Sequence, residues 1–339
     1  MEYRSPMADI VSRAECIAEE KLFPVAMETD RSGLVPKVNL DILADAGFYG
    51  LSGPPDAGGL GADFATAAAV IEALAGGCLT TTFVWNQHLP AVLAVQNSPL
   101  AGSWLAPLCS GERRAGLALG GSLPGPARLR ARETADGWRF TGTAAWLSGW
   151  DRIDVVNAAA RDEADNIVWA LLDARASETL TVEPVELLAL DATATVRARF
   201  HDHPVPSDRI LSVTPQNRWP AVNSAFVRLH AALALGVAGR CCRLLGPSPL
   251  DDELTACRTQ LDSAAPSELP GRRAQASMVA LRAAASLVTA TGSTAIEPGH
   301  AQRLAREALF LLVFGSRPPI KAALLDQLGA APADAPSLT

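Results

Sequence analysis

The sequence has few aromatic residues and no excess of positive charge. It contains 2 Tyr and 9 Phe among 339 residues, and its formal net charge is −7. Because such a chain offers no basic face to a phosphate polymer, we expect no nucleic-acid partner. Hydrophobic residues make up 49% of the chain. Alanine, the best helix former, supplies much of this content, which favours a protein rich in packed helices.

Metal-binding and redox motifs are missing as well. The six cysteines contain no CxxC pair, which disfavours a structural zinc site and a redox pair. We expect all six to be reduced and mostly buried, as is usual inside cells. His201 and His203 are close in sequence, but no third ligand lies near them. We therefore predict no metal site.

Long apolar runs are also absent. Residues 1–14 carry charges throughout and lack the apolar core of a signal peptide. The longest apolar runs, such as 231–238, are too short to cross a bilayer. We therefore expect a cytoplasmic protein that does not associate with a membrane. No GxGxxG motif follows a predicted strand, so a nicotinamide-binding Rossmann unit is not predicted.

Three regions differ in their residue patterns. The first has apolar residues at helical spacing, which predicts helices over 10–22, 38–46, 63–75 and 80–95. The second contains an Asp136-Gly137 hairpin signal and short β-prone runs, which predict strands over 128–134, 138–141, 153–158, 167–172, 179–182 and 193–200. We expect the strand region to end at Pro204, Pro206 and Pro215. The third is helical again, with helices predicted over 221–245, 250–264, 272–291 and 301–314.

Several local motifs connect this order to a known family. They are Phe23-Pro24-x-Ala26 with Asp30-Arg31, Leu43-Ala44-x-x-Gly47-x-x-Gly50-Leu51 with Gly58-Gly59-x-Gly61, and Trp104-Leu105-x-Pro107-Leu108-x-Ser110-Gly111-Glu112. Together with the helix–strand–helix order, they resemble the acyl-CoA dehydrogenase superfamily over essentially the whole chain. The resemblance implies an α+β multidomain fold. Its parts would be an N-terminal α-helical domain over 1–112, a middle β-barrel or β-sandwich domain over 113–215 and a C-terminal four-helix bundle over 216–339.

The segment 140–149 resembles the strand and turn that contact the flavin ring in this family. There an aromatic ring packs beside the flavin, and a hydroxyl residue two positions later faces the flavin N5 edge. The resemblance implies that Trp146, Leu147 and Ser148 bind the cofactor, where a preorganised donor stabilises charge on the reduced ring. A core tryptophan beside a turn serine is the alternative. The stretch 117–122 resembles the family's Ala-Met-Thr-Glu-Pro strand but has lost the Thr-Glu pair, and Ser122 is a candidate substitute.

The family's catalytic glutamate is missing from both positions that it occupies in relatives. That residue removes the α-proton of an acyl thioester while the β-hydride passes to the flavin. Gly315 stands at one position and Val227, immediately before Arg228, at the other. Neither side chain can accept a proton, and the loss of such a base costs several orders of magnitude in rate.

Three other side chains are candidates for a catalytic role. His88 lies on a helix expected to run toward the active-site face and would serve as an acid or base; a hydrogen-bonded core histidine is the alternative. Arg228 matches a family arginine near the reaction centre. Arg317 lies in the same loop as Gly315 and is suited to bind an anionic group. His230 is interpreted as a packing residue that points elsewhere.

The cofactor and the partners follow from the same resemblance. It implies FAD as cofactor, an acyl-CoA or other acyl thioester as substrate, a homodimer or homotetramer, and a place in lipid metabolism. Two departures leave the affinity for FAD open. The family's Arg-x-x-Phe-Gly segment, which helps to hold the pyrophosphate, is absent near 243–250, and the loop 291–295 is reduced from Gly-Gly-x-Gly-Tyr.

Three functions are compatible with these features. The first is an acyl-CoA dehydrogenase-like FAD-dependent oxidoreductase that catalyses α,β-dehydrogenation, with a base supplied either by an unusual residue or, if the chain is a base-deficient subunit of a heteromer, by a partner that keeps the glutamate. The second is a flavin-dependent monooxygenase of the same fold, because such relatives lack the glutamate and often carry a segment like Gln302-Arg303; His88 would then have a role. The third is a non-catalytic binding or scaffold subunit.

Overall fold

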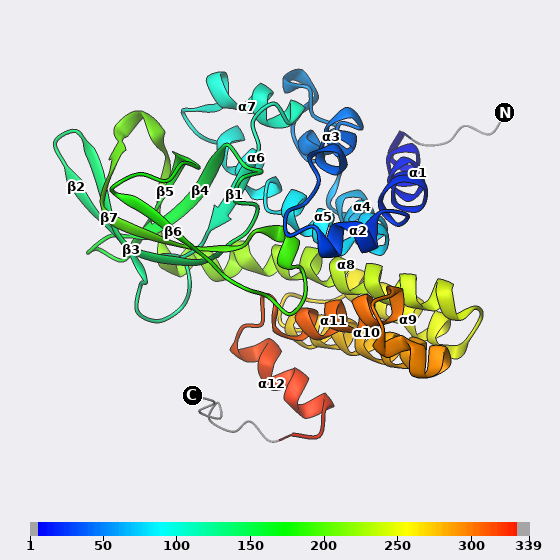
Figure 1. Ribbon diagram of the computed structural model, residues 1–339. Helices are drawn as coiled ribbons and strands as arrows, with labels where there is room; N and C mark the ends of the chain where they lie inside the picture. Colours follow the sequence, from blue (N-terminus) through cyan, green and yellow to red (C-terminus); the bar gives the residue numbers. More distant parts are fainter. Residues whose placement is uncertain (1–5, 331–339) are drawn as a thin grey trace. The chain divides into compact units, whose positions relative to one another are not determined.

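The computed structural model describes residues 6–330, except for the side chains of residues 6 and 220–224. The elements follow the order helices, strands, helices (Figure 1). By its contacts the chain forms two compact units. The first contains the residues up to Arg13, Glu28–Ala67 and Thr80–Ala221, and the second contains Ala14–Met27, Ala68–Leu79 and the chain from Val222 onward.

The N-terminal region is helical as predicted, with one interruption and two additional helices that the sequence pattern did not predict. The helices are α1 (Pro6–Ile17), α2 (Ala26–Arg31), α3 (Lys37–Asp45), α4 (Phe64–Gly77), α5 (Leu79–Asn86), α6 (Leu89–Gln96) and α7 (Ala101–Ser110). The additional ones are α2 and α7. The single helix expected over 80–95 is two helices, α5 and α6. Pro90 explains the break, because it has no N–H for the carbonyl four residues earlier and its ring crowds that carbonyl.

His88 lies at this break and connects it to two other elements. Its Nε2 donates to the Leu108 carbonyl on α7 at 3.1 Å, and its Nδ1 accepts the Ala115 N–H at 3.0 Å. The side chain is 1% exposed, and the ring edge of Tyr49 packs against it. Burial lowers the pKa of His88 to about 3. Both nitrogens are occupied by backbone groups, which is the geometry of a hydrogen-bonded core histidine.

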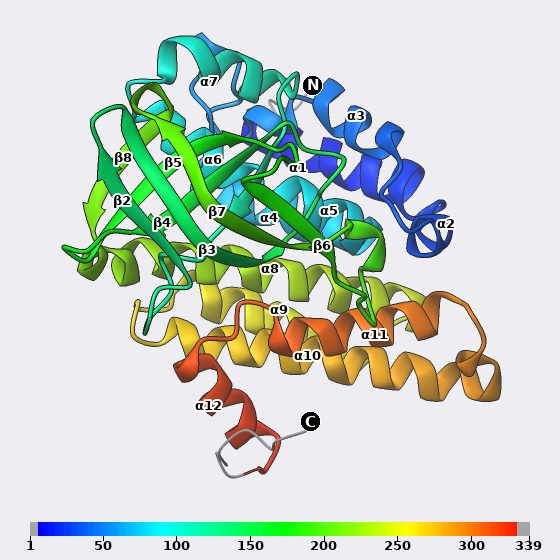
Figure 2. The ribbon, with the colours of Figure 1, turned by 60° about the vertical axis from the view of Figure 1, so that its left-hand side comes forward.

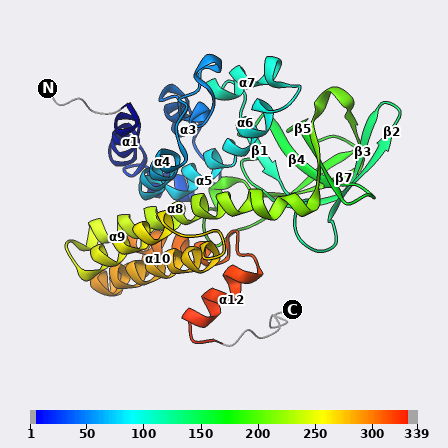
Figure 3. The same cartoon turned by 180° about the vertical axis from the view of Figure 1, so that it is seen from behind.

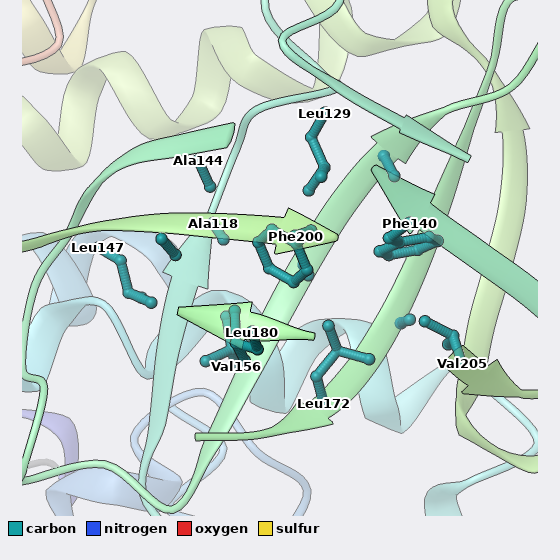
Figure 4. Packing of buried hydrophobic residues seen from close by; sticks show 14 of the residues in the cluster. Ala118, Leu129, Phe140, Ala144, Leu147, Val156, Leu172, Leu180, Phe200 and Val205 are labelled. Atoms are coloured by element: carbon teal, nitrogen blue, oxygen red, sulfur yellow. The ribbon is translucent and has the colours of Figure 1, made fainter. Parts of the chain in front are cut away.

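One eight-stranded mixed sheet follows the helices. Its strands are β1 (Ala115–Ala118), β2 (Leu129–Thr134), β3 (Gly137–Leu147), β4 (Val155–Arg161), β5 (Asn166–Asp173), β6 (Leu180–Pro184), β7 (Val196–Pro206) and β8 (Ile210–Pro215). The spatial order is β6-β7-β3-β2-β4-β5-β8, with β1 pairing β4 in parallel. The Asp136-Gly137 hairpin is present between β2 and β3. The sheet curves, so that Phe140 and Phe200 point into one interior together with Leu147, Leu172 and Val205 (Figure 4).

Pro215 ends the strand region as predicted, because it is the last residue of the last strand, β8. Pro204 and Pro206 do not end the region: Pro204 lies within β7, Pro206 is its last residue, and β8 follows. β6 pairs only with the part of β7 from Val196 to Phe200. Beyond Phe200 that edge of β7 has no partner strand. Pro204 and Pro206 are two positions apart and so face the same edge, where the N–H groups that they lack would have had no strand to bond to.

The second unit is built on long helices. They are α8 (Trp219–Leu245), α9 (Pro249–Asp262), α10 (Leu269–Thr291), α11 (His300–Val313) and the short α12 (Pro318–Gln327). Figures 2 and 3 show α9, α10 and α11 running side by side with α8, as a bundle. Arg240 on α8 is 3% exposed, donates to both carboxylate oxygens of Glu19 and to the Gly76 carbonyl, and lies over the ring of Phe23. This cluster ties the early segments to the bundle.

Two helices meet the length and hydropathy criteria for a membrane span, contrary to the expectation from the apolar runs. They are Ala225–Leu245, 83% buried in its most apolar window, and Leu269–Ile296, 33% buried. The expectation was based on uninterrupted apolar runs, whereas the mean hydropathy of an 18-residue window can be high even when the window contains isolated charges. Length and composition alone are weak evidence, because a buried core helix such as α8 passes the same test.

His88 makes the stability of the first unit dependent on pH. Its pKa of about 3 in the fold lies below the value of about 6.5 for an exposed histidine. The unfolded chain therefore binds the proton more tightly, and stability falls as the pH drops below about 6.5, by up to about 1.4 kcal/mol per pH unit. Urea unfolding between pH 7.5 and 5 measures this slope.

His88→Gln should flatten that slope while lowering stability at pH 7 by about 1–3 kcal/mol, because the flexible amide does not hold a donor toward the Leu108 carbonyl and an acceptor toward the Ala115 N–H as the rigid ring does. The matched control replaces exposed His201 by glutamine. Parallel curves for wild type and His88→Gln would contradict the assignment.

Candidate functional site

The end of β3 presents Trp146 to the surface through an irregularity in the sheet. Between Ala144 and Leu147, β3 has two residues where the partner strand β7 has one. This is a β-bulge, which bends a strand and redirects side chains. Trp146 has φ 65°, in the left-handed region that non-glycine residues rarely adopt, and its side chain is 62% exposed. The alternative of a tryptophan buried in the β-domain core does not fit this exposure.

The two residues after Trp146 turn inward and hold the bulge. Leu147 is 1% exposed and belongs to the core of the sheet. Ser148 is buried, and its hydroxyl lies 2.7 Å from that of Thr195, which lies 2.8 Å from that of Thr193. This chain of three hydroxyl groups fixes the Ser148 side chain. No motif in the sequence points to the two threonines.

The stretch that replaces the family's Thr-Glu pair is backbone packed against backbone. A Cβ at Gly120 would lie 2.6 Å from the Thr143 carbonyl oxygen, and one at Gly121 would lie 2.5 Å from the backbone of Ala160. Only glycine fits so close to β3 and β4. Ser122 is fully buried and donates its hydroxyl to the Leu119 carbonyl. Any contact that this stretch makes with a ligand therefore comes from its backbone.

The two glutamate positions differ in what surrounds them. Val227 on α8 is buried in an apolar cluster with Leu269, Ala274, Met278, Ile320 and Leu324, which belong to α10, α12 and the residues around them. A carboxylate there would lose its hydration without gaining a partner. Gly315 follows α11 with φ 62°, and a Cβ added to it would lie 3.0 Å from Nδ1 of His230. This contact corrects the prediction from the sequence that His230 points elsewhere.

The catalytic candidates are dispersed rather than gathered. His88 lies in the core of the first unit. Arg228 is 8% exposed, and two of its nitrogens donate to Oδ1 of Asp262 at 3.0 and 2.6 Å. Arg317 begins α12 and is partly buried. Of the predicted residues, the fold therefore brings Trp146, Leu147 and Ser148 together in one unit and places Val227, Arg228, Gly315 and Arg317 in the other.

The paired histidines of β7 bind hydroxyl groups. Nδ1 of His203 lies 2.9 Å from the Thr179 hydroxyl, and Nε2 of His201 lies 3.2 Å from that of Thr181. Within residues 6–330, no three His, Cys, Asp or Glu side chains gather as metal ligands would.

Comparisons with known sequences agree with the resemblance to the acyl-CoA dehydrogenases. Residues 8–112 match the family model of the acyl-CoA dehydrogenase N-terminal domain. Short-chain specific acyl-CoA dehydrogenase of Homo sapiens is 28% identical over 206 residues, which cover 57% of this chain and 50% of that protein. The 3-sulfinopropanoyl-CoA desulfinase of Variovorax paradoxus is 30% identical over 158 residues, covering 43% and 38%. The matched region thus covers about half of the length of the human relative and less than half of the length of the desulfinase.

The fold comparison covers nearly the whole chain. Butyryl-CoA dehydrogenase from Megasphaera elsdenii superimposes with a TM-score of 0.82 over 97% of this chain and 98% of that one, at 17% sequence identity. At that identity the likeness establishes the fold. Residues 8–112 therefore belong to the acyl-CoA dehydrogenase N-terminal domain family, and the chain as a whole has the acyl-CoA dehydrogenase fold.

Proposed function

We propose that this chain is an FAD-dependent oxidoreductase that acts on an acyl thioester. The observation that carries the proposal is Trp146, an indole that a β-bulge holds 62% exposed in an unfavourable backbone conformation. Backbone strain of this kind costs about 1–3 kcal/mol and persists where it positions a functional group. A flat aromatic surface held outward is suited to stack on a planar ring system.

The residues of the first unit fit the ring end of a flavin. Trp146 would supply the stacking surface, and Ser148, fixed by Thr195, would hold the polar edge of the ring. FAD supplies an acceptor for two electrons and a hydride when it is bound. The relatives named above support the substrate class, because each is named for a reaction of acyl-CoA thioesters.

A proton acceptor for α,β-dehydrogenation would come from a partner subunit. Val227 lies in an apolar cluster, and Gly315 has no side chain, so neither family position supplies a base. His88 has both nitrogens occupied and a pKa of about 3. Because both nitrogens are occupied, His88 has no free group for a monooxygenase reaction and does not support that alternative.

The surface of α10 supports self-association. Its most apolar window is only 33% buried, and Ala285 and Thr289, one turn apart, are exposed. Small side chains on an exposed helix face leave room for a helix of another copy to pack closely against it. A homo-oligomer formed through this face is part of the proposal.

The cofactor is tested by the visible spectrum of purified protein and by FAD titration. Trp146→Ala should weaken FAD binding at least about tenfold, because base–aromatic stacking of this kind contributes about 1–3 kcal/mol, and Trp146→Phe should retain most of it. Since Trp146 is mostly exposed, the alanine variant should lose less than about 1 kcal/mol of stability. Buried Leu147→Ala, the control, should lose about 2–5 kcal/mol. A colourless protein that takes up no FAD would leave only a scaffold role.

Autonomous turnover tests the missing base. The flavin-loaded chain alone, mixed with a panel of saturated acyl-CoAs, should bleach its flavin at least about 10²-fold more slowly than a relative with the glutamate, because general base catalysis contributes about 10²–10⁴. Stopped-flow absorbance provides the rates. Full reduction at the rate of such a relative would show that the chain holds its own base.

Ala285→Glu tests the oligomer. A charge on the open face of α10 should shift the protein to a smaller species in light scattering coupled to gel filtration, without changing its helix content. Thr259→Glu, at an exposed position of α9, is the control and should leave the mass unchanged. An unaltered mass for Ala285→Glu would place the interface elsewhere.

A further inference from the structure

A group of basic side chains surrounds the position where the family carries its glutamate. His230 on α8, Arg273 on α10 and Arg317 at the start of α12 lie around Gly315; we call them the basic cluster. The imidazole of His230 lies against the open side of Gly315, with Nδ1 3.0 Å from where a Cβ would be, and packs edge-on against Phe314 at 4.8 Å. The space in front of Gly315 is therefore filled by a neutral or cationic group in place of a carboxylate.

Arg273 joins the basic cluster to the end of α11 through hydrogen bonds. It is 2% exposed and donates to the Ser277 hydroxyl and to the carbonyls of Leu311 and Phe314, at 3.1 and 3.3 Å for the carbonyls. These bonds satisfy the end of α11 and hold the residue before Gly315. They satisfy the guanidinium by dipoles alone, so its positive charge is not cancelled by a carboxylate within residues 6–330.

Arg317 differs from Arg273 in being available. It is partly buried, and in the part of the chain that the structure describes its guanidinium has no hydrogen bond or ion pair; its backbone carbonyl accepts the Lys321 N–H at 2.8 Å. Burial lowers its pKa, so the charge is held without a counterion. A guanidinium in this state gains most from an anion with two oxygens, because the two can form parallel hydrogen bonds.

His230 could have been a replacement base, but its surroundings oppose this role. Burial and the charges of Arg273 and Arg317 lower the pKa of His230 well below its usual range. A base is effective when its pKa is near the working pH, and two neighbouring cations make the protonated ring less stable. As a neutral imidazole, His230 is suited to donate a hydrogen bond. The same two charges that weaken it as a base favour a negative ligand.

We propose that the basic cluster around Gly315 binds an anionic group on the acyl part of the substrate, such as a carboxylate or a sulfinate, with Arg317 as the principal ligand and His230 as a hydrogen-bond donor. The inference rests on the proposed acyl-thioester function and narrows it: the preferred substrate is an acyl thioester with a negative substituent rather than a plain aliphatic chain. The charge at this position is thus opposite to that of relatives with the glutamate.

Paired ligands test the proposal. Succinyl-CoA and butyryl-CoA have acyl chains of the same length and differ by a terminal carboxylate, and free CoA accounts for binding by the CoA phosphates. In calorimetric titrations of the full-length protein, we expect succinyl-CoA to bind at least about tenfold more tightly than butyryl-CoA. Arg317→Gln should reduce this ratio to about one, and Arg317→Lys should restore part of it.

Two controls separate the cluster from general charge effects. Arg282→Gln removes the same charge from α10 of the same bundle, at an arginine that pairs with Glu253, and should leave the ratio unchanged. The His230 ring, followed by NMR against a His230→Gln spectrum, should show a higher pKa with succinyl-CoA bound than with butyryl-CoA, because an anion stabilises the imidazolium.

The outcomes distinguish a failure of the anionic-substituent inference from a failure of the proposed function. Equal binding of the two thioesters, each tighter than CoA, would overturn the anionic-substituent inference and leave the proposed function standing. Binding of neither beyond CoA would overturn both. A preference for succinyl-CoA that persists in Arg317→Gln would overturn the assignment to this cluster.

Discussion

The turn at Gly315, in the second unit, depends on the hydrogen bonds of the buried Arg273 guanidinium. It joins α10 to the last carbonyls of α11, where a helix end carries partial negative charge. Burial lowers the pKa of Arg273 to about 10, yet the group remains charged at neutral pH. Because its partners are dipoles, the positive potential extends to the neighbouring His230. One residue thus both shapes the turn at Gly315 and determines its electrostatics.

Local patterns predicted most of the fold, because periodicity and turn chemistry act over a few residues. The Asp136-Gly137 hairpin is an example: a Cβ at Gly137 would lie 2.3 Å from the Val205 carbonyl oxygen, so glycine is required. The break at Pro90 was missed although local chemistry alone requires it. The error at Pro204 and Pro206 arose because a residue's effect there depends on its neighbours in space: both are tolerated in β7 only because that edge lacks a partner strand.

The site was predictable in part. Trp146 and Ser148 were identified by their motif, but the bulge that exposes one and the threonines that fix the other involve β7, about fifty residues later. The geometry of His88 favours the structural alternative, because its two partners, Leu108 and Ala115, are backbone groups that no side-chain motif reveals. His230 was discounted from its spacing to Arg228, although its contact with Gly315 joins residues 85 positions apart in the sequence.

The bulge before Leu147 also bears on how this segment can vary in length. Two residues of β3 oppose one of β7 there, and side chains alternate between the two faces of a strand. Removing one residue between Ala144 and Leu147 would restore a regular ladder and leave both residues on the core face, because residues two apart share a face. The core therefore does not require the extra residue. A deletion at this place would keep the packing of the sheet and remove the bulge that presents Trp146.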